Sequence, residues 1–465
     1  MDRRLADQLD RVFAAIDRDR DGAIGDLARF VQQPSIAAQD VGMAECAALT
    51  RELLRADGVP AEVYDVPGGP PLVLGRVPAG PGGDAMRTLF CYAHYDVQPV
   101  EPVERWVDPP FSGAVRDGRL WGRGASDNKS GVLAFSRAAR AWCEVAGGPP
   151  VNLLIFAEGE EEIGSIHLGP WVAAHPELLA ADGMLCLDGG IIASAGVPEV
   201  ALGLKAILYV ELRVRTMADD VHSLNAAIVP NAAWRLVEAL ATFRAPDGTI
   251  LIPDWLDGYQ PPTAADEALA DAEAARVDEA AWRRELGIAA FPNGLDRRGA
   301  VRDRRYRPTC NICGLTSGYQ GPGSKTIVPA YASAKLDFRL PPDLKPEEQE
   351  AKLRRHLDAR GFTDIEIGRF GPGEWPIKTP PEAPIAGAIE RAATRVFGAP
   401  PLVTGLSAEG TILRHVPMPL VLTGFSNADC NLHAPNENIV LDDYIRGIKY
   451  AAAIYAEFAG VASDG

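Results

Sequence analysis

Continuous apolar runs recur along the chain, separated by segments of helical periodicity. The runs are RTLFCYA (87–93), VNLLIFA (151–157), GMLCLD (183–188) and PLVLTGF (419–425). Between the first two, SGVLAFSRAARAWCEVAGG (130–148) is typical of a helix. Uninterrupted apolar strands that alternate with helices indicate an α/β sheet that is buried on both faces.

The middle of the chain has a different rhythm. Residues 201–216 and 330–340 alternate between apolar and polar positions, as half-exposed antiparallel strands do, and helices are expected near 231–244 and 346–359. An Asp-, Ala- and Arg-rich stretch at 253–308, which we expect to be partly helical, interrupts this α+β pattern.

Helices are also expected at both ends of the chain. ADQLDRVFAAIDR and GMAECAALTRELLRADG, which ends on a glycine, occupy the first sixty residues, and DDYIRGIKYAAAIYAEFAG closes the chain. We therefore predict a mixed-sheet α/β catalytic domain, formed by residues 1–198 and 376–465, that is split by an inserted α+β domain over residues 199–375.

Net charge, cysteine content and hydropathy restrict the partners and the compartment that we expect. The chain has 465 residues and a formal net charge of −17 at pH 7, which argues against nucleic acid and anionic membranes as partners. Its seven cysteines are scattered through apolar stretches and predict buried, reduced thiols. The first residues lack the apolar core of a signal peptide, and no stretch is long enough to span a bilayer. We expect a soluble, cytoplasmic protein.

Two short motifs mimic binding sites. DRDRDGAIGDLA, which starts at Asp17, resembles a calcium loop but has Ala28 where the bidentate glutamate belongs, so we predict a helix end with its turn. Cys310 and Cys313 form a CxxC without a second pair or a nearby histidine pair, so we predict two small residues on a buried strand.

The apolar runs end in groups that can bind metal. The first delivers His94 and the last delivers His433, while the other two deliver the glutamates of FAEGEEEIGS and Asp188. Asp127 lies in a glycine-rich loop before a helix. In open α/β sheets, sites form at the carboxyl ends of strands. Mixed His, Asp and Glu ligation suits zinc or manganese.

Taken singly, each of these residues has an ordinary structural explanation. His94 alone would be a hydrogen-bonded core histidine, Asp127 a helix N-cap, and Asp188 and His433 turn or loop residues. Their shared placement favours a metal site instead. The other histidines, apart from one in DDVHS, are not at strand ends and are expected to be surface or packing residues: His167, His175, His356 and His415.

The chain resembles the M20 metallopeptidases, in particular their dipeptidase and carnosinase-like branch. The matching motifs, in order, are HYDVQP, GRGASDNKSG, EGEEEIGS, VHS, SGYQGPGSKTIVPAYASAKLDFRLPP and HAPNEN. The resemblance covers nearly the whole chain. It implies a catalytic α/β domain, an inserted lid domain that also mediates dimerisation, and two divalent metal ions per chain, zinc or manganese.

The resemblance also implies roles for single residues. One ion would be bound by His94 and Asp188, and the other by Glu162 and His433, with Asp127 bridging both. Asp96 would accept the free ring N–H of His94. Glu161 would be the general base, and Glu158 and Glu160 receive no role; a register shifted by one within Glu160–Glu162 stays open.

Further roles fall on the inserted domain and on a late loop. The resemblance implies that His222 in DDVHS reaches the site of the partner subunit, and that Arg339 and Thr326 hold the substrate carboxylate. The chain departs from the family at Ser130, where lysine usually runs into glycine, and in LSAEGTI, where Thr411 keeps a hydroxyl for substrate contact.

Two enzymatic functions fit these residues. The first is a dinuclear-metal dipeptidase that acts on peptides with a free C-terminal carboxylate, and the alternative is an N-acyl-amino-acid amidohydrolase on the same site. The sequence does not separate them, since the distinguishing pocket lies in the lid. A catalytically silent dimeric binding protein would require a lost ligand or base, and none is lost. We expect a homodimer.

Overall fold

A computed structural model describes residues 1–192, 195–370, 375–407 and 418–460. The chain divides into two compact units. The first comprises Met1–Gly203 and Lys378–Thr404 together with the C-terminal part of the chain, and the second comprises Leu204–Ile377.

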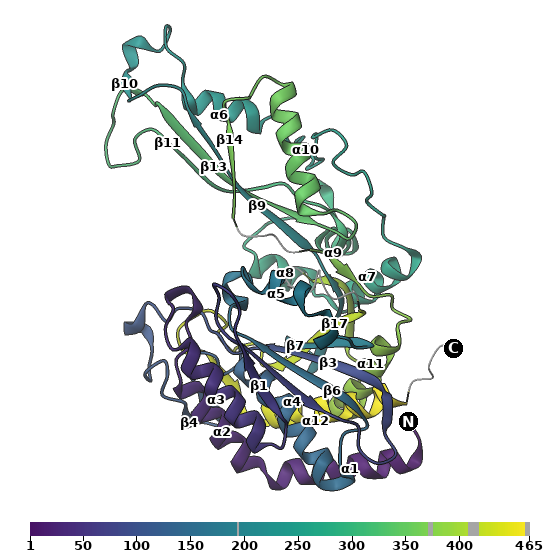
Figure 1. The fold of residues 1–465 in the computed structure, drawn as a ribbon. Coiled ribbons are helices and arrows are strands. Elements are labelled where there is room, and N and C mark those ends of the chain that lie inside the picture. Colours follow the sequence, from purple (N-terminus) through teal and green to yellow (C-terminus); the bar gives the residue numbers. More distant parts are fainter. Residues whose placement is uncertain (193–194, 371–374, 408–417, 461–465) are drawn as a thin grey trace. The chain divides into compact units, whose positions relative to one another are not determined.

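The first unit is built on a mixed β-sheet (Figure 1). Its strands run in the order β1-β2-β6-β3-β7-β17-β8-β15, with β16 also paired to β8, and β6, β3, β7 and β17 are parallel to one another. The strand bounds are β1 Ala61–Tyr64, β2 Leu72–Val77, β3 Asp84–His94, β6 Val151–Glu158, β7 Gly183–Ile192, β8 Val197–Leu204, β15 Ile377–Lys378, β16 Leu402–Ser407 and β17 Leu420–Ser426. The expected apolar runs are these four parallel strands, which confirms the α/β part of the fold.

Helices cover this sheet because its central strands are apolar at nearly every position. The last six residues of β3 and of β6 are all buried. Against them pack α4 (Lys129–Ala146) and α12 (Leu441–Ala459), and α1 (Arg3–Arg18) lies on these two helices. The remaining helices of eight or more residues in this unit are α2 Arg20–Gln32, α3 Met43–Ala56 and α11 Pro384–Phe397.

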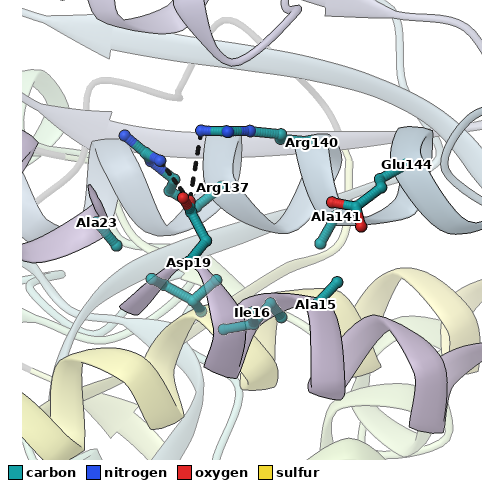
Figure 2. Close-up of a pocket in the computed structure, with 9 residues that line it drawn as sticks. Ala15, Ile16, Asp19, Ala23, Arg137, Arg140, Ala141 and Glu144 are labelled. Carbon is teal, nitrogen blue, oxygen red and sulfur yellow. Dashed lines mark hydrogen bonds and ion pairs between the residues drawn. The ribbon is translucent and has the colours of Figure 1, made fainter. Parts of the chain in front are cut away.

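The stretch that mimics a calcium loop is mostly helix. α1 ends at Arg18 as expected, but α2 begins at Arg20 after a single intervening residue, Asp19. The Asp19 carboxylate contacts two arginines of α4, with 2.6 Å to Arg137 and 3.4 Å to Arg140 (Figure 2). These ion pairs give the break between the helices a reason that the sequence did not show: Asp19 joins both to α4.

The second unit is an α+β layer (Figure 1). Its antiparallel sheet has the order β11-β13-β9-β14, and α6 and α10 pack on one face of it. The bounds are β9 Ala206–Arg215, β11 Asn311–Ser317, β13 Tyr331–Leu340, β14 Glu366–Arg369, α6 Ala232–Leu240 and α10 Pro346–Ala359. Alternate residues of β9 and β13 form the core beneath the helices, which confirms the expected half-exposed strands.

Two details of the expected elements are wrong. The alternating stretch 201–216 is two strands, since β8 ends at Leu204 and β9 begins at Ala206. The CxxC does not lie on a buried strand: Cys313 is exposed on β11, and Cys310 is half-buried just before that strand. β11 is an edge strand and its side chains are therefore largely uncovered.

Residues 253–308 contain three α-helices of the second unit. They are α7 Ala264–Arg276, α8 Glu279–Glu285 and α9 Arg297–Tyr306. The partly helical expectation is thereby confirmed. Among the described residues, no helix combines the length and apolar character needed to cross a bilayer.

Candidate metal centre

Two groups of potential metal ligands lie in the first unit and share one residue. In each group, one donor atom from every member lies within 4.8 Å of the others. The groups are His94, Asp127 and Asp188, and Asp127, Glu162 and His433. These are the residues that the sequence picked out, so the fold brings all of the predicted ligands together.

The first group is formed where strands β3 and β7 lie next to one another. His94 is the last residue of β3, and its Nε2 lies 3.1 Å from Asp127 Oδ1 and 3.5 Å from Asp188 Oδ2. Asp188 lies within β7, which continues to Ile192 and does not end at this residue. Asn128 donates to the carboxylate of Asp188 and, at 2.8 Å, to the carbonyl of Leu187.

The second group joins three separate loops, which carry Asp127, Glu162 and His433. His433 Nε2 lies 3.0 Å from Asp127 Oδ2 and 3.2 Å from Glu162 Oε2. Glu162 is in a short 3₁₀ turn after β6, and His433 follows β17 with a left-handed φ of 56°. The Gln98 side chain donates to Glu162 Oε2 at 2.8 Å, and its backbone N–H donates to Oε1 at 3.1 Å, which fixes the glutamate.

Asp127 turns one carboxylate oxygen to each imidazole, which is the geometry of a bridging ligand. Although burial opposes its ionisation, a hydrogen bond from His433 and the positive charge of His94 lower the pKa of Asp127 well below its ordinary value. The same contacts act in reverse on the histidine: hydrogen bonds to Asp127 and Glu162 raise the pKa of His433 to about 10. The site therefore attracts positive charge.

A divalent ion fits this arrangement. His94 is fully buried, and its Nε2 has no hydrogen-bond partner although it faces two carboxylates. Buried polar atoms in folded proteins are nearly always satisfied. Imidazole nitrogen and carboxylate oxygen are ligands for zinc and manganese, so an ion between His94 and Asp127 would satisfy the orphaned atom.

Asp96 contacts both the His94 ring and the turn that carries Glu161 and Glu162. Its Oδ1 lies 3.3 Å from His94 Nδ1, which also lies 3.1 Å from the Asp96 carbonyl. The same carboxylate accepts the backbone N–H groups of Glu161 at 3.2 Å and Glu162 at 3.0 Å. Asp96 therefore sets the orientation of the His94 ring and of the glutamate turn together.

The glutamates of the cluster differ in their surroundings. Glu158 is buried and accepts hydrogen bonds from Tyr92 and, at 2.8 Å, from Ser165, and its burial raises its pKa to about 8. Glu160 is also buried and accepts the backbone N–H groups of His167 at 2.6 Å and Leu168 at 2.8 Å. These two glutamates shape the loop from within.

Glu161 is influenced electrostatically by the charged groups of the site. Burial and the negative charges of Asp188 and Asp127 raise its pKa well above the ordinary value, against the opposing charge of His94. A carboxylate with a raised pKa is suited to accept and return a proton near neutral pH. Glu161 is not a member of either ligand group.

Three of the predicted site residues lie in the second unit. His222 ends the short strand β10 (Val221–His222), and Thr326 directly precedes β12 (Ile327–Val328), the strand that pairs with β10. Both residues are exposed, and Ser223 N–H donates to the Thr326 carbonyl at 3.0 Å. Arg339 is half-buried on β13, and its N–H donates to Thr309 Oγ1 at 3.3 Å. Thr411 lies outside the described residues, as does His415.

The sequence analysis missed two residues that hold the ligands. Gln98 follows His94 within HYDVQP, and Glu437 follows His433 within HAPNEN, so proximity to a ligand within one motif was the available signal. Of the other histidines, His175 stacks on Trp171 and His356 packs edge-on to Phe243, as packing residues do. His167 instead lies 2.9 Å from Glu160, beside the site loop.

Comparison with known proteins gives a consistent picture. The model of peptidase family M20/M25/M40 matches residues 90–457. The chain is 26% identical to a Cys-Gly metallodipeptidase of Schizosaccharomyces pombe, over 97% of this chain and 99% of the relative. It is 27% identical to the human β-Ala-His dipeptidase, over 97% and 93% of the two chains.

Solved structures agree with these relatives. An M20 family metallo-carboxypeptidase from Sulfolobus solfataricus superimposes with a TM-score of 0.86 and 32% identity, covering 94% of this chain and 99% of that one. Human carnosine dipeptidase 1 superimposes with a TM-score of 0.75 and 26% identity, over 97% and 100%.

Proposed function

The chain belongs to peptidase family M20/M25/M40, and from this premise we propose that it is a dinuclear-metal dipeptidase. It would hydrolyse the amide bond of dipeptides or short peptides that carry a free C-terminal carboxylate. The observation that carries the proposal is the pair of ligand groups that share Asp127. The relatives named for Cys-Gly and β-Ala-His hydrolysis support dipeptides as the substrate class.

The residues of the chain divide the reaction among them. When bound, two ions supply Lewis acidity that polarises the scissile carbonyl and lowers the pKa of water. Glu161 removes the proton from the attacking water and delivers it to the leaving amine. Asp96 keeps the His94 ring oriented through its contact with Nδ1, and Gln98 keeps Glu162 in place.

Residues of the second unit would bind the rest of the substrate. Arg339 would pair with the substrate carboxylate with help from Thr326 and Thr411, and His222 would donate to the oxyanion that forms during attack. The exposure of His222 and Thr326 supports this role, because both side chains are accessible to a ligand. Mixed N and O ligation supports zinc or manganese as the native ion.

A substrate panel tests the proposal. Enzyme supplied with zinc or manganese should hydrolyse Cys-Gly, β-Ala-His and other dipeptides, and should be slow on the same dipeptides with an amidated C-terminus. Asp127→Ala is the matched inactive control because it removes the shared ligand. Turnover of acetylated amino acids without turnover of any dipeptide would establish the amidohydrolase alternative instead.

We further propose that the chain forms a homodimer through residues 199–375, its lid domain. Edge strand β11 exposes Ile312 and Leu315 on the face that carries α6, and α6 exposes Trp234 and Val237. An uncovered apolar strip beside a free strand edge is typical of an interface. His222 would then complete the site of the partner subunit.

Subunit mixing tests this arrangement. His222→Ala and Glu161→Gln subunits are each expected to be inactive, but a mixed dimer would have one intact site if His222 acts across the interface. Activity should then return to about a quarter of the wild-type level after random exchange of equal amounts. Full exchange, checked by native mass spectrometry, with no recovered turnover would place His222 within its own subunit's site or outside catalysis.

We also propose a cytoplasmic location. All seven cysteines are free, and Cys46, Cys91 and Cys186 are buried thiols, as suits a reducing compartment. Cell fractionation with an antibody to the native protein checks this.

A further inference from the structure

A buried ion pair connects the chain segments that carry the candidate metal ligands. Arg123 and Glu437 have 1% and 0% of their surface exposed, and their side chains meet at 2.8 Å between Arg123 Nη1 and Glu437 Oε2. Burying two charges costs several kcal/mol per ion before their attraction is counted, so such a pair is weak evidence for stability by itself. Its other contacts indicate what it does.

Glu437 holds the loop that presents Asp127. Its Oε1 accepts the backbone N–H groups of Ser126 at 3.0 Å and Asp127 at 3.1 Å, and its Oε2 accepts that of Gly124 at 3.0 Å. The Glu437 carbonyl accepts the N–H of Gly122 at 2.9 Å. Four N–H groups of residues 122–127 are thereby directed at Glu437.

The same pair reaches the two other ligand loops. Glu437 lies four positions after His433 in the chain. Arg123 Nη2 donates to the Pro99 carbonyl at 3.2 Å, one residue after the Gln98 that holds Glu162. Three separate segments that carry ligands therefore converge on this ion pair.

We propose that Glu437, held by Arg123, is a positioning residue that fixes the bridging ligand Asp127 and thereby sets the affinity of the chain for its two ions. The inference rests on the proposed two-metal site. Glu437 itself is not a member of either ligand group, so it acts through the backbone of the Asp127 loop. Residues that orient metal ligands typically change metal affinity about 10–100-fold when they are replaced.

Glu437→Gln tests the proposal with almost no change in volume. Each Glu437 oxygen accepts two donors, so the amide nitrogen of glutamine meets two N–H groups in either of its two orientations. We expect metal binding, measured by competition with a chromogenic chelator, to weaken about 10–100-fold, while catalysis recovers partly at saturating metal.

The matched control is a second buried ion pair, which joins two helices of the second unit and contains none of the candidate ligands. Glu273 on α7 and Arg305 on α9 meet at 2.7 Å in the second unit, with side chains 5% and 7% exposed. Glu273→Gln breaks a comparable pair and should leave metal affinity unchanged. Equal weakening in both variants would attribute the effect to general destabilisation and overturn the proposal.

A second readout needs no metal. Amide hydrogen exchange of a peptide spanning residues 122–128 should accelerate in metal-free Glu437→Gln, since the N–H groups that meet the glutamine amide nitrogen lose their acceptor. If that variant does not fold, Arg123→Met with Glu437→Gln removes the charge from both sides and carries the same expectation. Wild-type metal affinity in a folded variant would refute the inference, whereas a wild-type chain that binds no metal would refute the proposed function itself.

Discussion

The assignment of Glu162 as a ligand and Glu161 as the base can be tested by two single substitutions. In Glu162→Gln, an NH₂ group replaces one of the two side-chain oxygens. Oε2 lies 3.2 Å from His433 Nε2, at the metal position, and 2.8 Å from Gln98 Nε2, while Oε1 lies 3.1 Å from the Gln98 backbone nitrogen. In either orientation, the NH₂ group therefore faces the metal position or a Gln98 N–H group. A hydrogen bond to a charged group contributes about 1.5–3 kcal/mol, and one of these is lost in either orientation. This corresponds to about 10–100-fold in affinity, before the lost ligand charge is counted.

Glu161→Gln should behave in the opposite way. Removal of a general base typically lowers the rate about 10²–10⁴-fold, and this side chain is not a member of either ligand group, so metal content should stay normal. The assays are metal content after gel filtration, metal affinity by competition, and kcat at saturating metal. Glu144→Gln, an exposed residue of α4, is the control that should change neither quantity.

The result that refutes this reasoning is an exchange of the two phenotypes. If Glu161→Gln lost metal while Glu162→Gln bound it normally, the ligand would be Glu161 and the register would shift by one residue. The base would then have to be Glu160, whose carboxylate is directed at the N–H groups of His167 and Leu168.

Further outcomes follow from other parts of the molecule. Chelation should abolish activity, and zinc or manganese should restore it, as measured by dipeptide turnover before and after dialysis. Burial and nearby arginines lower the pKa of Lys205 to about 7 in the folded state. Between pH 7 and about 10.4, the Lys205 amine is therefore protonated in the unfolded state and mostly neutral in the folded state, so the unfolded state binds more protons. Stability should therefore rise with pH in this window relative to Lys205→Met, as measured by urea unfolding at pH 7 and pH 9.5. Cys313, the exposed cysteine, should be alkylated before Cys46, Cys91 and Cys186, as mass spectrometry of partially labelled protein would show.

The pattern of apolar runs predicted the parallel strands because each run is buried on both faces and therefore reads as a continuous hydrophobic segment. The same pattern placed His94 at the end of β3, since a polar residue directly after such a run must lie at the edge of the sheet. Local pattern contains nothing about partners far along the chain, so the contacts of Glu437 with residues 122–127 were invisible. The ion pairs of Asp19 were likewise not predictable, because its arginine partners lie on α4.

The sequence also did not show which glutamates of the cluster are buried. In EGEEEIGS, every glutamate has the same chemistry, and only the path of the turn decides that Glu158 and Glu160 face inward while Glu162 faces His433. The exposure of Cys313 had the same origin, because β11 becomes an edge strand only through the strand order of the sheet. Resemblance to a family supplied the roles that periodicity could not.

The interrupted first unit has a consequence for synthesis of the protein on the ribosome. The ligands His94, Asp127 and Asp188 emerge before the second unit, whereas His433 emerges about 245 residues after Asp188, a delay of roughly 10–50 s at 5–20 residues per second. Strand β17 arrives equally late, although it lies between β7 and β8. Until β17 is synthesised, strand β7 of the nascent sheet therefore lacks this neighbour, and its unpaired backbone groups can pair with a wrong strand. The chain acquires its second candidate ligand group and closes this edge of β7 within the same last stretch of translation, so we expect a ribosome-bound intermediate to lack the second proposed metal site.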